Sequence, residues 1–330
     1  MAHQDLISVL IPAYNHERYV QEAIQSIIAQ TYDNIELIVI DDGSPDNTWS
    51  KIQEMKKACA KRFSGLILER QSNHGVGYTF NRALELAKGQ YVYTIASDDA
   101  AKPDALEILH DFLSAHKDYA LAVGNNEIID AASKRAYWDK KTNLVYNKEK
   151  AAYHTFKDFL TRSKHHIDFN SDDFGTYKSL LKRNYIPNGY LIRKDIFSKT
   201  GGYVAEAPLE DWYIMLQISK YAKMKYIDKI LFSYRWHGRN TIRQTSRMRD
   251  YIQKTFTHEI KLVAEKGSKE IKRIMHDFLE TNSKKTYINL GPLLQVYRVK
   301  NPAYKEYVIK YFNKEKRIKR AKSGYKLQKS

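Results

Sequence analysis

The sequence has little that would suit an oxidising compartment or a lipid bilayer. A single cysteine, Cys59, among 330 residues excludes an intramolecular disulfide and is typical of a reducing compartment. No apolar run approaches the roughly 18 residues that a membrane-spanning helix needs. The amino terminus lacks the basic segment and cleavage site of a signal peptide. These absences predict a cytoplasmic protein.

An even distribution of charge is also missing. The formal net charge is +17, and residues 251–330 carry 20 Lys and Arg against 7 Asp and Glu, so the first 250 residues are nearly neutral. The total charge suggests a basic nucleic-acid-binding protein, but no base-reading motif supports that class and the neutral part argues against it. The pattern instead predicts no nucleic-acid partner and a peripheral electrostatic contact through the C-terminal quarter.

The first 125 residues alternate between two apolar patterns. Short continuous runs rich in Val and Ile are typical of buried parallel strands, and the segments between them have apolar residues at helical spacing. This alternation predicts an α/β fold with a Rossmann-like, mostly parallel sheet flanked by helices. Strands are predicted at 6–12, 35–40, 65–69, 90–96 and 119–124, with helices at 20–28, at 46–60, at 77–89 closed by Gly89, and from Pro103.

The alternation stops at about residue 126. Residues 130–185 are polar and show no period, residues 209–222 predict a helix, and residues 225–236 predict a strand. The pattern of residues 250–330 predicts mainly helices. We therefore divide the chain into three regions at 1–125, 126–245 and 246–330, the last being a basic helical extension.

Pairs of acidic residues follow two of the predicted strands. Asp41 and Asp42 come after 35–40, and Asp98 and Asp99 end the stretch YVYTIASDD. Ligands of open α/β sheets bind beyond the carboxyl ends of the strands, so these acids converge if their strands are neighbours. Adjacent carboxylates can hold Mg²⁺ or Mn²⁺ together with diphosphate oxygens. They can equally serve as turn and helix-cap residues.

The segment ISVLIPAYNHERYVQEAIQSIIAQTYDNIELIVIDDGSPDNT (7–48) resembles the N-terminal signature of family 2 glycosyltransferases, inverting enzymes of the GT-A fold, of the bacterial surface-polysaccharide type. The resemblance continues through NHGVGYTFNRALELAKGQYVYTIASDDAAKPDAL (73–106). It weakens over 126–185 and returns at 188–217 and in YRWHGRN (234–240). It implies that residues 1–125 bind a nucleotide sugar and that 126–245 form the acceptor side of the same domain.

The resemblance also implies roles for individual residues. Asp99 and His237 would hold the divalent cation, Mn²⁺ or Mg²⁺, and Asp211 would be the catalytic base. Glu210 competes with Asp211 for that role, and either acid could simply stabilise the start of its helix. The nucleotide sugar, with UDP favoured, would contact Pro12, Ala13, Tyr14, Asp42, Asn73, Gly75, Gly77, Ser97 and Asp98, with Tyr14 packing on the uracil and Asp42 accepting from its imide edge.

One departure from the family pattern concerns a positive charge. Family members often carry an arginine at the position of Phe80, and the resemblance suggests that Arg82 or Arg235 supplies the missing contact.

The implied reaction is transfer of a sugar, with inversion, from a nucleotide sugar to a hydroxyl of a glycan or lipid-linked oligosaccharide in surface polysaccharide synthesis. The alternative within the same fold is a non-catalytic nucleotide-sugar-binding protein, which the presence of Asp99 and Asp211 disfavours. Aromatic residues at helical spacing among lysines over 304–320 predict a basic amphipathic helix. It either lies on the anionic inner face of the cytoplasmic membrane as a peripheral contact or packs on the catalytic domain.

Overall fold

The computed structural model describes residues 5–162 and 167–282. The predicted amphipathic helix over 304–320 lies outside these residues. The chain divides into two compact units, Met1–Tyr251 and Ile252–Ser330. Within the described residues, no helix has both the length and the apolar composition needed to cross a membrane.

The N-terminal part of the first unit alternates strands and helices, as the apolar patterns predict. Val20, Ala23, Ile24 and Ile27 of α1 are buried, which is the one-sided pattern of a helix lying on a sheet. The elements are β1 (Ile7–Ala13), α1 (Val20–Ile28), β2 (Ile35–Asp41), α2 (Thr48–Glu54), α3 (Lys56–Arg62), β3 (Gly65–Arg70), α4 (Val76–Leu86), β4 (Tyr91–Thr94), β5 (Ala100–Ala101), α5 (Ala105–Ala115) and β6 (Tyr119–Ile129).

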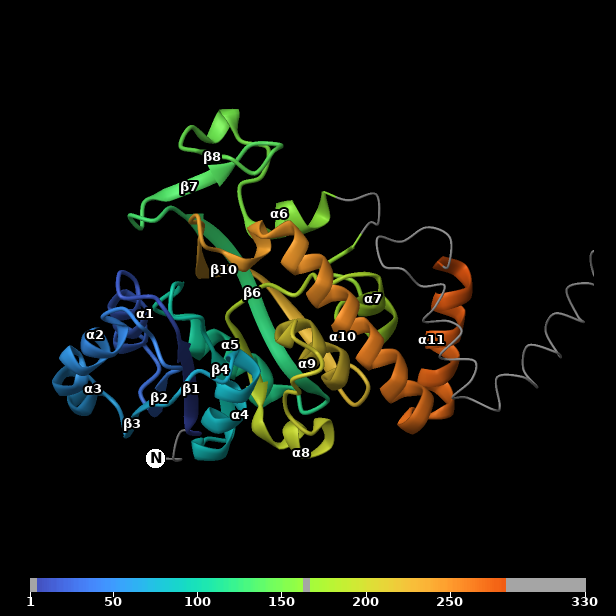
Figure 1. Ribbon diagram of the computed structural model, residues 1–330, viewed down its shortest axis with the longest axis horizontal. Coiled ribbons are helices and arrows are strands. Elements are labelled where there is room, and N and C mark those ends of the chain that lie inside the picture. Colours follow the sequence, from blue (N-terminus) through green and yellow to red (C-terminus); the bar gives the residue numbers. More distant parts are fainter. Residues whose placement is uncertain (1–4, 163–166, 283–330) are drawn as a thin grey trace, which may run out of the picture. The chain divides into compact units, whose positions relative to one another are not determined.

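The rest of the first unit has shorter elements. The β7–β8 hairpin extends from one end of β6 (Figure 1). The elements are β7 (Arg135–Trp138), β8 (Leu144–Val145), α6 (Phe156–Thr161), α7 (Tyr177–Lys182), β9 (Tyr190–Arg193), α8 (Phe197–Thr200), α9 (Glu210–Ile218) and β10 (Lys223–Arg235). Helix α10 (Thr245–Lys266) runs into the second unit, where α11 (Lys269–Asn282) follows and Phe256 contacts Phe278.

The strands form one mixed, mostly parallel sheet in the order β3-β2-β1-β4-β9-β6-β10-β5. Strands β3, β2, β1 and β4 are mutually parallel, and β6 is parallel to β10. The predicted fold class is therefore confirmed. Strand β9 runs antiparallel between β4 and β6. Strand β9 cannot be predicted from the sequence, because four residues in a region without a clear period give too short a signal.

Helices cover both faces of the sheet. One face buries Val9 and Leu37 in a cluster that also contains Ile24 of α1 and Leu109 of α5. Helix α4 contacts β1 and β2. Burying apolar side chains on both faces explains why these strands read as continuous apolar runs.

Two local expectations were wrong. The helix predicted over 46–60 is split into α2 and α3 at Met55. Helix α4 ends at Leu86, so Gly89 does not close it. A Cβ at Gly89 would lie 2.5 Å from the Leu6 carbonyl oxygen, so the glycine is needed for close approach to β1.

Candidate active site

The carboxyl ends of β2, β1 and β4 lie side by side in the sheet. The residues that follow them are therefore neighbours, and the Asp42 backbone N–H donates to the Ala13 carbonyl at 2.8 Å. Pro12 and Ala13 close β1, and the Tyr14 side chain after them is 45% exposed. The sheet edge at which the strand-end residues were expected to converge therefore exists.

Asp42 holds the loop between β3 and α4. Its carboxylate accepts from the backbone N–H groups of His74 (2.9 Å) and Gly75 (2.8 Å) and from the Gln71 side chain (2.8 Å). Gly75 has φ +90°, a conformation that favours glycine. Asn73 is exposed on this loop, and Gly77 lies in the first turn of α4. The structure thus brings Asp42 together with the predicted loop residues.

The predicted replacements for the missing arginine are engaged elsewhere. Phe80 is buried and its ring stacks on Tyr203, with centroids 5.0 Å apart. Arg82 pairs with Glu69 at 2.9 Å. The Arg235 side chain is fully buried, and its guanidinium donates to protein oxygens. The suggestion that Arg235 contacts a phosphate is therefore wrong.

Two histidines surround Asp98 at the end of β4. His237 Nε2 lies 2.9 Å from Asp98 Oδ2, and His16 Nε2 lies 3.7 Å from the same oxygen. One ligand atom from each of the three residues lies within 4.8 Å of the others. His16 Nδ1 is 2.8 Å from the hydroxyl of Ser97, which is buried. Two imidazoles and one carboxylate are a donor set that a divalent transition metal accepts, so these residues fit a cation.

Asp99 has a different environment from Asp98. Its Oδ1 accepts from the Arg235 backbone N–H at 2.8 Å, and the Asn188 side chain also bonds to it. It is not part of the His16–Asp98–His237 group. Asp99 was predicted to hold the cation together with His237, but the carboxylate beside His237 in the structure is that of Asp98. The two side chains diverge because consecutive residues of an extended or turn segment point in different directions.

Burial and hydrogen bonding shift the pKa values of Asp98 and Asp99 in opposite directions. Burial acts to raise the pKa of Asp98, but the hydrogen bond from His237 and the charges of His16 and His237 outweigh it and lower that pKa. Burial and the neighbouring charge of Asp98 hold the pKa of Asp99 well above its ordinary value. These effects favour the ionised form of Asp98 and the protonated form of Asp99.

Asp211 lies in the first turn of α9. Its Oδ2 accepts from the Asn184 side chain at 2.8 Å and its Oδ1 from the Trp212 backbone N–H at 2.6 Å, which holds the carboxylate in one orientation. Burial raises the pKa of Asp211. Burial and the charge of Asp211 raise the pKa of the adjacent Glu210 to about 8.

The buried Tyr234 hydroxyl is influenced both by Asp211 and by the strand-end acids. Burial raises the pKa of this hydroxyl well above its ordinary value, and the charges of Asp99, Asp98 and Asp211 raise it further. The charges of all three carboxylates therefore act on this one buried residue. Asp42 is not among these groups and belongs to the neighbouring loop at the end of β2.

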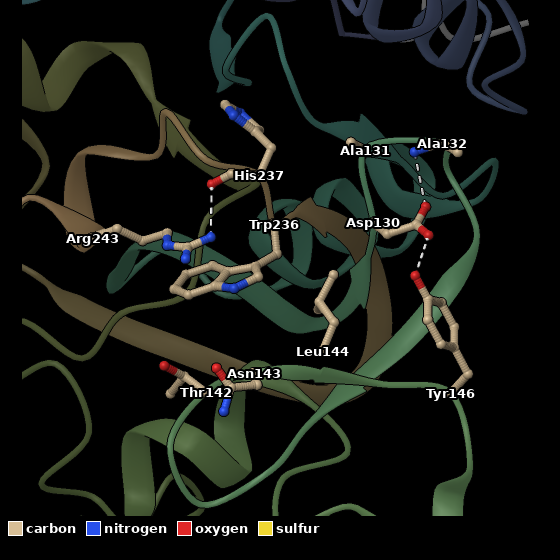
Figure 2. A pocket seen from close by; sticks show the side chains of 10 residues that line it. All are labelled: Asp130, Ala131, Ala132, Thr142, Asn143, Leu144, Tyr146, Trp236, His237 and Arg243. Carbon is tan, nitrogen blue, oxygen red and sulfur yellow. Dashed lines mark hydrogen bonds between the residues drawn. The ribbon is translucent and has the colours of Figure 1, made fainter.

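A cavity of about 430 Å³ opens beside this group, and Figure 2 shows the residues that line it. Its lining comes from the turn after β6, the loop before and after β8, and the segment after β10. The Arg243 guanidinium lies 5.3 Å from the centre of the Trp236 ring and donates to the His237 carbonyl at 3.4 Å. The Tyr146 hydroxyl donates to Asp130 at 2.7 Å. The imidazole of His237 points away from Trp236 (Figure 2).

Sequence reasoning missed two residues of the site. His16 follows the end of β1 in the stretch YNHER. Its position after a predicted strand is the same signal that identified the acidic residues, and it could have identified this histidine too. Asn184 lies in the region without a period, and nothing in the sequence around it indicated contact with Asp211.

Comparison with known proteins identifies the family of this chain. The family model described as glycosyl transferase family 2 matches residues 8–185, more than half of the chain. Glycosyltransferase GlyG of Streptococcus pneumoniae is 27% identical over 236 residues, which cover 70% of this chain and 71% of that protein.

Two solved structures share the fold. S. aureus TarS 1-349 in complex with UDP-GlcNAc matches with a TM-score of 0.56 and 17% identity, covering 85% of this chain and 73% of that one. The mannosyltransferase PcManGT from Pyrobaculum calidifontis, in complex with GDP-Man and Mn2+, matches with a TM-score of 0.57 and 14% identity over 91% and 88% of the two chains. With the GT-A sheet in place and the family model spanning most of it, the chain belongs to glycosyl transferase family 2.

Proposed function

We propose that this glycosyltransferase moves a sugar from a nucleotide sugar, with UDP as the preferred nucleotide, to a hydroxyl group of an acceptor with inversion at the anomeric carbon. The observation that carries the proposal is the 2.9 Å contact of Asp98 with His237 where β4 and β10 end, together with an Asp211 carboxylate oriented by Asn184 and the Trp212 backbone. TarS in complex with UDP-GlcNAc has the same fold, which supports the nucleotide-sugar donor.

The donor side of the proposed site is the edge formed by β2, β1 and β4. The exposed ring of Tyr14 is available to pack on a base, and the loop held by Asp42 would close over the nucleotide, with Pro12, Ala13, Asn73, Gly75 and Gly77 alongside. Asp42 already accepts three protein hydrogen bonds, so its contribution is chiefly to order this loop.

A divalent cation, Mn²⁺ or Mg²⁺, would be held by Asp98 and His237, and it would neutralise charge on the diphosphate leaving group. Mn²⁺ is present in the fold relative PcManGT, which supports this assignment. Asp99 would act indirectly, because its bond to the Arg235 backbone joins β10 to the end of β4.

Asp211 is the proposed general base. The acceptor hydroxyl gives its proton to the Asp211 carboxylate as its oxygen forms the new bond to the anomeric carbon. The bond from that carbon to the diphosphate breaks, and the nucleoside diphosphate departs with the electron pair. Asp211 is preferred to Glu210 for this role because the Asn184 side chain and the Trp212 backbone N–H hold its carboxylate in one orientation.

The acceptor would enter from the side of residues 126–245, through the cavity beside Trp236. The polar side chains of Asn143 and Arg243 in its lining could bind the hydroxyl groups of a sugar. We propose a glycan or lipid-linked oligosaccharide of a surface polysaccharide as the acceptor. A peripheral membrane contact through residues 304–320 remains a prediction from sequence.

The test is a binding and hydrolysis screen of nucleotide sugars with Mn²⁺ or Mg²⁺. Asp98→Ala should lose metal-dependent donor binding, whereas Asp211→Asn should keep binding and lose transfer. Asp111→Asn, which removes an exposed acid of α5, is the matched control and should retain both. If Asp211→Asn transfers sugar at the rate of the control, the assignment of the base fails.

A further inference from the structure

His16 lies where a third protein ligand of the cation would stand. Its Nε2 is 3.7 Å from Asp98 Oδ2, a carboxylate oxygen that His237 Nε2 also approaches at 2.9 Å. The two histidines are far apart in the sequence, since His16 follows β1 and His237 follows β10. Ligand atoms on adjacent corners of an octahedron with bonds of about 2.1 Å lie about 3 Å apart, so these separations suit one shared ion.

The His16 ring is already held in the orientation that a ligand needs. The Ser97 hydroxyl, 2.8 Å from Nδ1, can accept a hydrogen bond from the Nδ1–H group and leave the lone pair on Nε2 facing Asp98. The His16 backbone N–H donates to Thr48 at 2.8 Å, and Asn15 before it has φ +58°.

We infer that His16, Asp98 and His237 together form a two-histidine, one-carboxylate site that selects Mn²⁺ or another divalent transition metal over Mg²⁺. This inference rests on the proposed function, which itself requires only Asp98 and His237. Imidazole nitrogen suits transition metals, whereas Mg²⁺ prefers oxygen ligands and retains its water. A second imidazole therefore adds affinity for Mn²⁺ and little for Mg²⁺.

The test measures Mn²⁺ and Mg²⁺ binding to the full chain with UDP present, by calorimetry, and counts nitrogen ligands by pulsed electron paramagnetic resonance of bound Mn²⁺. The wild type should bind Mn²⁺ with couplings to two imidazole nitrogens. His16→Ala and the more conservative His16→Gln should bind it about tenfold or more weakly, with one coupling left and Mg²⁺ binding nearly unchanged. His116→Ala, an exposed histidine at the end of α5, should behave as wild type.

The outcomes separate the two ideas. If both His16 variants keep wild-type Mn²⁺ affinity and both nitrogen couplings, His16 is not a ligand and the inference is overturned, while the proposed function stands. If the wild type binds no Mn²⁺ with UDP present, the inference is overturned together with the metal site of the proposed function. Circular dichroism of each variant verifies that lost binding does not reflect lost folding.

Discussion

Gly189→Ala tests how closely the segment around Gly189 packs against β10, because an alanine there would have both an unfavourable backbone conformation and a steric clash. Gly189 has φ +77°, and an added Cβ would lie 2.2 Å from Cδ2 of Phe232, whose ring is fully buried in β10. The left-handed backbone costs an L-residue about 1–2 kcal/mol. Overpacking against a ring that cannot move away costs about 1–3 kcal/mol more. We expect Gly189→Ala to destabilise the catalytic unit by about 2–5 kcal/mol.

Gly201 supplies the matched control. It has φ +78°, but nothing lies within 4 Å of an added Cβ. Gly201→Ala should therefore show the backbone cost alone, about 1–2 kcal/mol. Urea denaturation followed by tryptophan fluorescence gives both values, and the difference between the variants isolates the clash with Phe232. Equal losses in the two variants would refute the argument that packing against β10 holds this segment.

Gly189→Ala should also affect catalysis, because the preceding residue, Asn188, bonds to Asp99. We expect Gly189→Ala to bind the donor more weakly in the presence of metal. Binding should be measured without denaturant, at a temperature at which the variant is still folded. Gly201→Ala should bind the donor as the wild type does.

Three further predictions concern buried charges. Arg235→Met should destabilise the catalytic unit by about 3 kcal/mol in urea denaturation, because it leaves the Asp98 carbonyl and the Ser133 hydroxyl without a buried cationic partner; a loss below 1 kcal/mol would contradict this. Asp42→Ala frees the loop at His74 and Gly75, so it should raise the KM for the nucleotide sugar several-fold with kcat nearly unchanged, and a fall in kcat alone would count against a loop-ordering role. Glu210 has a folded-state pKa of about 8 against an ordinary value of 4.5, so the folded state keeps a proton that the unfolded state loses. Its contribution to stability is complete below pH 4.5 and is lost as the pH rises to about 8. Glu210→Gln should therefore gain thermal stability over wild type at pH 9 but not at pH 4, and parallel pH profiles of the two melting temperatures would disprove the shift.

The order of elements in the first half of the chain could be predicted because it depends on local patterns. The run LIVI (37–40) in β2 has no polar position, which only a strand covered on both faces tolerates. The acids after these strands could be placed at one edge because parallel strands share the direction of their carboxyl ends. Strand β9 and the hairpin of β7 and β8 could not be predicted, since short strands are stabilised mainly by their neighbours in the sheet.

The sequence by itself determined that this is a family 2 glycosyltransferase with acidic residues at the strand ends, because the apolar pattern of the fold and the family motif each lie in contiguous segments of the chain. Only the tertiary structure decided which acid of the Asp98–Asp99 pair meets His237, since neighbouring side chains diverge and their partners come from distant strands. It also decided that His16 joins that group and that Arg235 is buried beneath it. Contacts between residues more than a hundred positions apart depend on how the sheet closes, and no local pattern encodes that.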